Sequence, residues 1–167
     1  NIFKSFNPST MSVSRPLALL DVLNAIEIAK NDPNISGVYL ELSPMMSVGT
    51  ATLEEIRNAL IDFRSSGKFI VSYNDTYTQA TYYLSSVADR MYLNPAGGLA
   101  WQGMAAQALF FKGTLDKLGV EPEIIRHGKY KSAIEPYTSD KMSPENREQT
   151  ESLVHAVWDN VVAGVSE

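Results

Sequence analysis

Residues 35–74 read ISGVYLELSPMMSVGTATLEEIRNALIDFRSSGKFIVSYN, and this stretch decides the fold class. Its first eight residues, 35–42, are rich in β-branched and aromatic side chains, which is typical of a strand. Residues 52–67 are expected to form a helix, and residues 68–74 a second strand. A strand, a helix and a strand joined by short connections predict two parallel strands linked by a helical crossover.

Residue types that favour helix ends mark two of the expected helices. In the quoted stretch, Thr52 and Glu55 form a capping-box pattern, and Gly67 suits the left-handed conformation that ends many helices. In the last expected helix, Ser143 can act as N-cap and Pro144 fits the first helical position. These signals place the helix boundaries without reference to any neighbour in space.

Helices and strands alternate through the rest of the chain with short connections. This pattern predicts a single α/β domain over residues 1–167 with a mostly parallel sheet. The further expected elements are helices at 14–31 (capped by Ser14, with Pro16 in its first turn), 77–88, 104–119 and from 143 onward, strands at 90–94 and 121–127, and a loop at 95–103.

Composition excludes several classes of function. The formal net charge is -5 and no lysine or arginine cluster stands out, which argues against a nucleic-acid partner. The chain has no cysteine, so disulfides, thiolate metal sites and a cysteine nucleophile are excluded. No apolar run reaches the roughly 18 residues of a membrane helix, and no glycine-rich nucleotide motif is present, so no cofactor is expected. The last helical pattern still runs at Glu167, so we expect a longer parent protein.

The two histidines do not indicate a site. His127 and His155 lie far apart in the sequence and share no metal-like spacing with carboxylates. His155 falls on the flank of the last expected helix, where a histidine is common. Structural roles are therefore expected for both.

Two lysines spaced two residues apart are the strongest candidates for chemistry. A lysine acts as a general base only when burial or a neighbouring cation lowers its pKa toward neutrality. In a serine–lysine dyad, such a lysine takes the proton from the serine hydroxyl. In an extended segment Lys129 and Lys131 would point to the same face, so their spacing does not choose between them.

The residues around these lysines resemble a known family. The segment Tyr130-Lys131-Ser132-Ala133 resembles the signal peptide peptidase A (protease IV) family. Three short motifs that follow it add to the resemblance: Glu135-Pro136, Met142-Ser143-Pro144 and Arg147-Glu148. The resemblance extends over nearly the whole chain and looks closest to the N-terminal half of double-length bacterial members. It implies a Clp protease/crotonase-like superhelix of β-β-α units. It also implies a serine endopeptidase that cleaves membrane-held peptides, including remnant signal peptides.

The resemblance also implies roles for individual residues. The catalytic lysine of double-length members directly precedes the Ser-Ala pair, which corresponds to Lys131 here. The adjacent Ser132 could orient its amine. The family's nucleophile lies in a Ser-Gly-Gly-Tyr-Tyr motif at a helix N-terminus, but the matching residues here are Gln79-Ala80-Thr81-Tyr82-Tyr83, listed in chain order. A glutamine amide cannot act as the nucleophile.

Other nearby groups do not restore a nucleophile or an oxyanion hole. Thr78, Ser85 and Ser86 are out of register with the motif, and we expect them on the helix surface or at its caps. Fully catalytic halves place a glycine pair after the first long strand, where backbone N–H groups approach the substrate carbonyl. Here that loop, residues 43–49, offers one glycine, Gly49, beside Met46 and Val48.

The resemblance therefore implies a split active site. Lys131 would be supplied by this chain, and the serine and oxyanion hole by a C-terminal half of the same protein beyond Glu167. The chain alone is expected to be inactive. Implied partners are peptide substrates, further copies in a ring or bowl, and the bacterial cytoplasmic membrane, reached by an anchor outside this chain with the domain on the outer face.

Two alternatives remain open. The same fold could serve as an inert assembly module, as the altered nucleophile and oxyanion positions suggest. An acyl-CoA enzyme of the crotonase class would need a paired oxyanion hole for the thioester carbonyl, which the Met-Met loop does not provide.

Overall fold

The computed structural model describes residues 6–7, 12–13, 18–43, 48–123 and 132–167. The chain divides into two compact units, Asn1–Trp101 and Gln102–Glu167, here named the N-terminal and C-terminal units. Near the start of the N-terminal unit, β1 (Phe6–Asn7) pairs antiparallel with β2 (Ser12–Val13).

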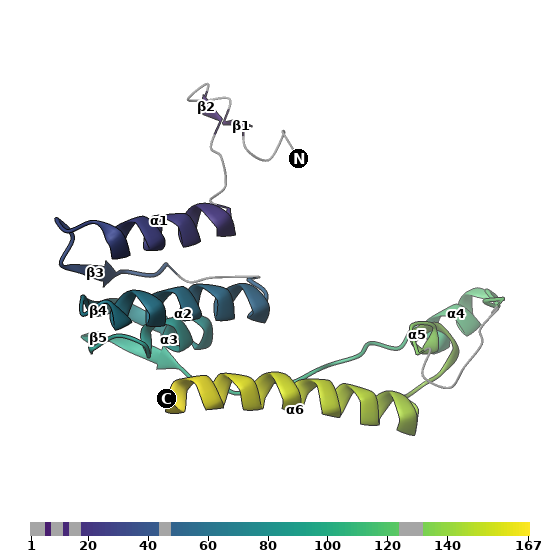
Figure 1. Ribbon diagram of the computed structural model, residues 1–167. Coiled ribbons are helices and arrows are strands. Elements are labelled where there is room, and N and C mark those ends of the chain that lie inside the picture. Colours follow the sequence, from purple (N-terminus) through teal and green to yellow (C-terminus); the bar gives the residue numbers. More distant parts are fainter. Residues whose placement is uncertain (1–5, 8–11, 14–17, 44–47, 124–131) are drawn as a thin grey trace. The chain divides into compact units, whose positions relative to one another are not determined.

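A three-stranded parallel sheet forms the centre of the N-terminal unit (Figure 1). Its order is β3 (Gly37–Leu40), β4 (Phe69–Thr78) and β5 (Arg90–Ala100). The predicted α/β class with a parallel sheet is confirmed, and it agrees with a Clp protease/crotonase-like fold. The predicted loop over 95–103 is wrong for residues 95–100, which continue strand β5.

An irregularity divides β4 and β5 into two segments each. Asn74 pairs with Leu93 and Thr76 with Gly98, so Asp75 lies opposite the four residues 94–97. The Asn94 side-chain amide donates to Asp75 Oδ1 at 2.7 Å and fixes this bulge. Gly97 lies so close to the Asp75 carbonyl that a Cβ there would overlap it. Two strand segments followed by a helix are what a β-β-α unit requires.

Three helices accompany this sheet: α1 (Leu19–Asn31), α2 (Thr50–Ser65) and α3 (Gln79–Ser85). The predicted capping box at Thr52 is wrong, because α2 begins at Thr50 and its N-cap, Gly49, makes no side-chain bond. Gly67 follows α2 with a φ of 85°, as predicted for a helix end. The predicted start of the first helix, at residues 14–17, lies outside the described residues.

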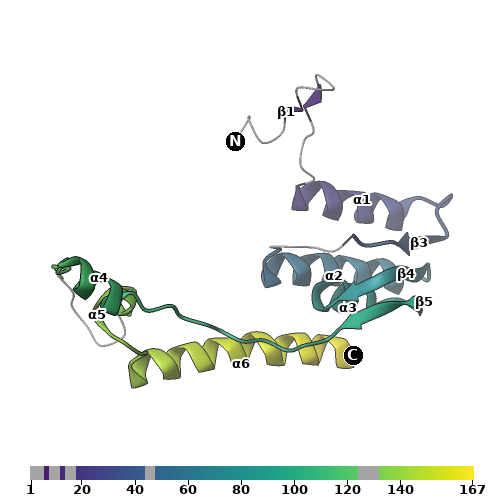
Figure 2. The ribbon, with the colours of Figure 1, turned by 180° about the vertical axis from the view of Figure 1, so that it is seen from behind.

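The apolar core lies between the sheet and its helices. Leu60 and Phe63 of α2 are at most 2% exposed, as is Ile70 of β4. Figures 1 and 2 show from opposite sides that α2 covers one face of β4. Residues of β4 that face the helices alternate with residues that point away, as in Phe69, which is 52% exposed. The core thus forms on one face of the sheet.

The C-terminal unit consists of α4 (Lys112–Leu118), α5 (Glu135–Thr138) and α6 (Pro144–Ser166). The predicted start of the last helix is confirmed, since Ser143 is the N-cap and Pro144 the first helical residue. The helix predicted over 104–119 is wrong before residue 112. Of the strand predicted at 121–127, residues 121–123 have no regular structure and the rest lie outside the described residues.

The failure of the 104–119 helix has a local physical reason. Exposed apolar side chains such as Leu109, 64% exposed, show that this segment does not bury a helical apolar face. Instead, the Phe111 N–H donates to the Pro136 carbonyl at 2.6 Å, and the Phe111 ring stacks on Tyr137 of α5. These contacts set where α4 begins.

Candidate functional site

A capping box closes the start of α3, which carries the predicted counterpart of the family's serine position. The Thr78 hydroxyl accepts the Thr81 N–H at 3.3 Å, and the Thr81 hydroxyl accepts the Thr78 N–H at 2.8 Å. Gln79 is the first residue of α3, which confirms that this motif lies at a helix N-terminus. Thr78 is a capping residue, as predicted. Thr81 is fully buried, so its hydroxyl has a structural role in this turn.

Three buried hydroxyls behind α3 form a network. Ser72 Oγ of β4 lies 2.8 Å from Ser85 Oγ and 3.0 Å from the Tyr77 hydroxyl. The Tyr77 hydroxyl donates to the Tyr92 carbonyl at 3.0 Å. The prediction that Ser85 lies on the helix surface is therefore wrong, because the last turn of α3 faces β4. Ser86 lies at the C-cap, as predicted, and its hydroxyl donates to the Tyr83 carbonyl at 2.9 Å.

Aromatic contacts hold α3 in place. Tyr82 packs edge-on against Tyr77 and Trp101, with ring centroids 6.2 and 5.3 Å apart. The buried guanidinium of Arg57 lies over the Tyr83 ring, 5.1 Å from its centroid. The double tyrosine of the motif is therefore a packing element here.

The residues just after β3 and the irregular middle of β4 line an open cavity of about 250 Å³. Asn74 is buried beside it, and its Oδ1 accepts the Leu42 N–H at 2.9 Å. Its Nδ2 has no hydrogen-bond partner among the described residues. The other lining residues include the carboxylates Glu41 and Asp75. The cavity therefore has an acidic rim and lacks a nucleophile–base pair within the described chain.

The predicted oxyanion loop is described at both ends only. Ser43 and Val48 are exposed, and Gly49 is the N-cap of α2. The space where a Gly49 Cβ would lie is open. Met46 lies outside the described residues, so the expected absence of an oxyanion hole in this loop stays a prediction.

Lys129 and Lys131, the two candidate bases, also lie outside the described residues, as does His127. Ser132, which directly follows Lys131 in the sequence, is half-buried, and its carbonyl accepts the Glu135 N–H at 2.9 Å. The role of Lys131 and the assistance of Ser132 therefore stay predictions.

Glu135 belongs to the Glu-Pro pair that follows the lysine motif, but its contacts could not be predicted from the sequence. It is 4% exposed, on the short helix α5. Its Oε1 accepts the Ser143 hydroxyl at 2.6 Å, and its Oε2 accepts the Ser143 N–H at 3.1 Å and the Asn146 side-chain amide at 2.8 Å. A buried carboxylate needs such partners. The signal available from sequence was the Ser-Pro helix start eight residues later.

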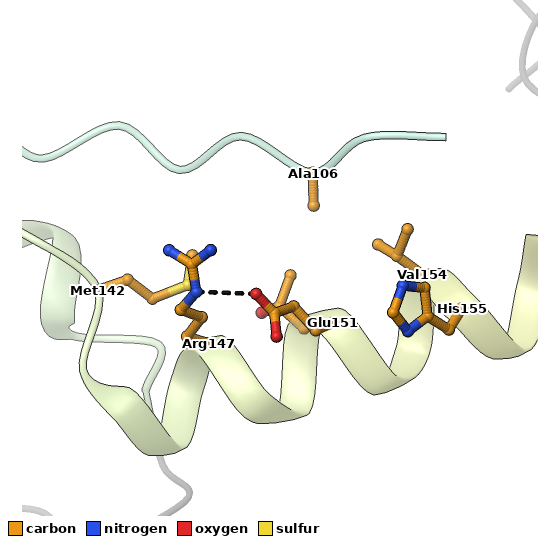
Figure 3. Close-up of a pocket in the computed structure, with 7 residues that line it drawn as sticks. Ala106, Met142, Arg147, Glu151, Val154 and His155 are labelled. Atoms are coloured by element: carbon orange, nitrogen blue, oxygen red, sulfur yellow. Dashed lines mark hydrogen bonds and ion pairs between the residues drawn. The ribbon is translucent and has the colours of Figure 1, made fainter. Parts of the chain in front are cut away.

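The C-terminal unit also has an open groove beside α6 (Figure 3). Arg147 and Glu151 line it and pair with each other at 2.8 Å. His155, exposed on α6, lines it too, and Ala106 lies on the opposite wall. The charged groups of this groove are used by an i,i+4 ion pair, so it offers no assembled catalytic group.

Two lysines with raised pKa values belong to surface ion pairs. The hydrogen bond to Asp116 at 3.3 Å raises the pKa of Lys112, and the nearby Asp140 carboxylate adds to this shift. A hydrogen bond to Asp62 at 2.6 Å raises the pKa of Lys30. In both cases the shift stabilises the charged lysine, which is opposite to what a general base needs.

The described residues provide neither a metal-binding cluster nor a membrane-spanning helix. They contain no group of three or more acidic or histidine side chains placed to hold a metal ion. None of their helices combines the length and hydropathy needed to cross a bilayer.

Known proteins are similar to this chain over most of its length. The profile of peptidase family S49 matches residues 62–167. Protease 4 of Haemophilus influenzae is 39% identical over 155 residues, which are 93% of this chain and 25% of that protein. Protease 4 of Salmonella typhi is 39% identical over 149 residues, 89% of this chain and 24% of that protein.

A plant protein is similar as well. The chloroplastic serine protease SPPA of Arabidopsis thaliana is 37% identical over 139 residues, 83% of this chain and 20% of that protein. The chain thus spans a quarter or less of the length of each of these relatives. Because the family profile covers more than half of the chain, the chain belongs to peptidase family S49.

Proposed function

We propose that this chain is the lysine-bearing part of a serine–lysine dyad endopeptidase. Membership of family S49 and the 39% identity to proteins named Protease 4 support a peptidase. One observation carries the finer proposal. The Tyr130-Lys131-Ser132-Ala133 motif is intact, whereas Gln79 occupies the serine position at the start of α3. This combination fits a donor of the base that receives its nucleophile from elsewhere.

The proposed chemistry begins with Lys131 as a neutral amine. It takes the proton from the hydroxyl of a serine in a C-terminal half of the same protein. The serine oxygen then attacks the peptide carbonyl carbon, the C–N bond breaks, and the proton passes to the leaving amine. In the second half of the reaction the Lys131 amine deprotonates a water molecule, which attacks the acyl carbon. The ester C–O bond then breaks, the acid product leaves, and the proton passes from Lys131 to the serine oxygen. Covering Lys131 with the second half would desolvate it and lower its pKa.

The chain alone is therefore proposed to be inactive. The capping box between Thr78 and Thr81 supports this, because the α3 start uses these hydroxyls for structure. Ser72 and Ser85 are buried with each other and with Tyr77, so their hydroxyls are not placed to meet a substrate.

Substrates, location and assembly follow from the family resemblance. We propose membrane-held peptides as substrates, among them remnant signal peptides. The protein would act at the outer face of the bacterial cytoplasmic membrane, held by an anchor outside this chain, and assemble as a homo-oligomeric ring or bowl. The net charge of -5 supports the expectation that nucleic acid is not a partner.

The test is peptide hydrolysis by the full-length protein with Lys131→Ala, beside Lys129→Ala and wild type. We expect Lys131→Ala to lower kcat/KM by roughly a hundredfold or more, as loss of a general base does. Gln79→Ala is the matched control at the altered serine position and should retain activity. Assembly of each variant is checked by its sedimentation. Full activity of Lys131→Ala would refute the proposal.

A second candidate function is an inert assembly module. The presence of Gln79 where the family resemblance implies a serine, and the structural role of the buried Thr81, favour it. It predicts that Lys131→Ala leaves hydrolysis unchanged, whereas substitutions that prevent assembly abolish it. The activity of Lys131→Ala, measured on a variant that still assembles, therefore separates the two functions.

A further inference from the structure

We propose that Glu135 is a positioning residue for the site. It ties the turn that begins next to Lys131 in the sequence to the N-terminus of α6. The inference rests on the proposed role of Lys131 as the base. The cluster that carries it consists of Ser132, Glu135, Ser143 and Asn146, all of them described.

The first step is the carboxylate itself. Glu135 is 4% exposed and both of its oxygens accept hydrogen bonds from the start of α6. Removing the acceptor would leave the Ser143 N–H and the Asn146 side-chain amide, both on half-buried residues, without this hydrogen-bond partner. Donors without a partner lower the stability of the folded state. The carboxylate therefore holds α5 against the start of α6 in one geometry.

The second step is the backbone of the same residue. The Glu135 N–H donates to the Ser132 carbonyl at 2.9 Å, which closes the turn over residues 132–135. The Glu135 carbonyl accepts the Ser139 N–H at 2.9 Å, at the other end of α5. Ser132 directly follows Lys131 in the sequence. Glu135 therefore fixes the described turn that starts at Ser132.

The third step is the rigidity of the anchor. Ser143 Oγ donates to Glu135 and accepts the Asn146 N–H at 3.1 Å, so the N-cap of α6 and the carboxylate share one hydroxyl. Helix α6 is 23 residues long, so the hydrogen bonds of Glu135 attach α5 to an extended element of regular structure. A base must be held within a fraction of an ångström of its productive place, and a rigid support provides this.

A helix cap alone would not require Glu135. Ser143 caps α6 by its own bond to Asn146, so the helix start is satisfied without the carboxylate. The carboxylate adds the link from α6 to α5 and to the Ser132 turn. This link is what distinguishes a positioning role from a purely structural one.

The test uses the full-length enzyme with Glu135→Gln, which keeps the shape but replaces one acceptor oxygen by the NH2 group of an amide, a hydrogen-bond donor. We expect kcat to fall about 10- to 100-fold, the range seen when a supporting residue behind a catalytic group is changed, with KM altered less than twofold. The acid limb of the kcat–pH profile should move to higher pH, because a misplaced, better solvated lysine holds its proton more strongly. Glu151→Gln on α6, an exposed carboxylate, is the matched control and should be neutral.

A second variant guards against loss of folding. Asn146→Ala removes one donor to the carboxylate and leaves the other two. We expect a smaller fall in kcat with the same direction of pH shift. If Lys131→Ala is inactive but Glu135→Gln and Asn146→Ala keep the wild-type kcat and pH profile, the inference is wrong and the proposed function stands. If Lys131→Ala is active, the proposed function fails and this inference fails with it.

Discussion

Each of the two units is stabilised internally, and the main forces differ between them. In the N-terminal unit, four apolar residues that are at most 2% exposed form a core between sheet and helices: Leu60, Phe63, Ile70 and Val87. In the described part of the C-terminal unit, the buried residues are Glu135, Val161 and Gly164, and the contacts around α5 are mainly hydrogen bonds. Apolar burial is non-directional, whereas hydrogen bonds fix angles and distances.

This difference indicates that the two units tolerate substitution differently. The N-terminal unit gains its stability from area removed from water, so many apolar substitutes of similar volume would keep it folded. The C-terminal unit places a few polar groups exactly where their partners lie, and it contains the segment that follows Lys131. If this difference holds, substitutions in the two units should change stability by different amounts and in different ways.

The largest effect is expected from Phe63→Ala in α2. Phe63 is fully buried, so the substitution leaves a cavity and should cost about 3–5 kcal/mol of unfolding free energy. Urea denaturation followed by circular dichroism measures it. Phe69→Ala on β4 is the matched control, because that ring is 52% exposed and should cost clearly less. Equal losses from the two variants would show that the core is not where the sheet and α2 meet.

An intermediate effect is expected from Ser143→Ala. It removes the N-cap of α6 and one bond to Glu135, which together should cost about 1–3 kcal/mol. Hydrogen exchange at the amides of the first turn of α6 should speed up, beginning with Asn146. Ser166→Ala, at the other end of the same helix, loses only a bond to the Val162 carbonyl and should leave those amides unchanged. Unchanged exchange in Ser143→Ala would contradict the polar anchor.

The smallest effect is expected from Lys30→Met, which removes the surface pair between α1 and α2. Because its hydrogen bond to Asp62 raises the pKa of Lys30, the pair stabilises the folded state fully below the ordinary lysine pKa of 10.5. That stabilisation disappears as the pH rises through the raised pKa. The difference in unfolding free energy between wild type and variant should therefore shrink above that pH. A difference that is constant across this range would exclude the pair.

Some features were predictable because they depend on neighbours in sequence. The alternation of strands and helices, the end of α2 at Gly67 and the start of α6 at Ser143-Pro144 all follow from local propensity and capping. The family, too, followed from residues read in order. The choice of Lys131 over Lys129 came from the resemblance and not from physics, and it stays a prediction.

Other features needed contacts between residues far apart in the sequence. Residues 95–100 contain proline and two glycines and resemble a loop, yet they continue β5, because Gly97 can approach the Asp75 carbonyl where other residues would clash. The 104–119 segment has helical composition, but its first half does not bury an apolar face, so α4 begins only at Lys112.

The α/β class, the family and the absence of a serine at position 79 could all be read from the order of the residues alone. The tertiary structure alone decided that Ser85 is buried against Ser72 and that Glu135 holds Ser143 and Asn146. These partners are separated by 13, 8 and 11 positions in the chain. Propensity and periodicity do not report which of many polar groups will meet at such separations, since packing of whole elements sets those distances.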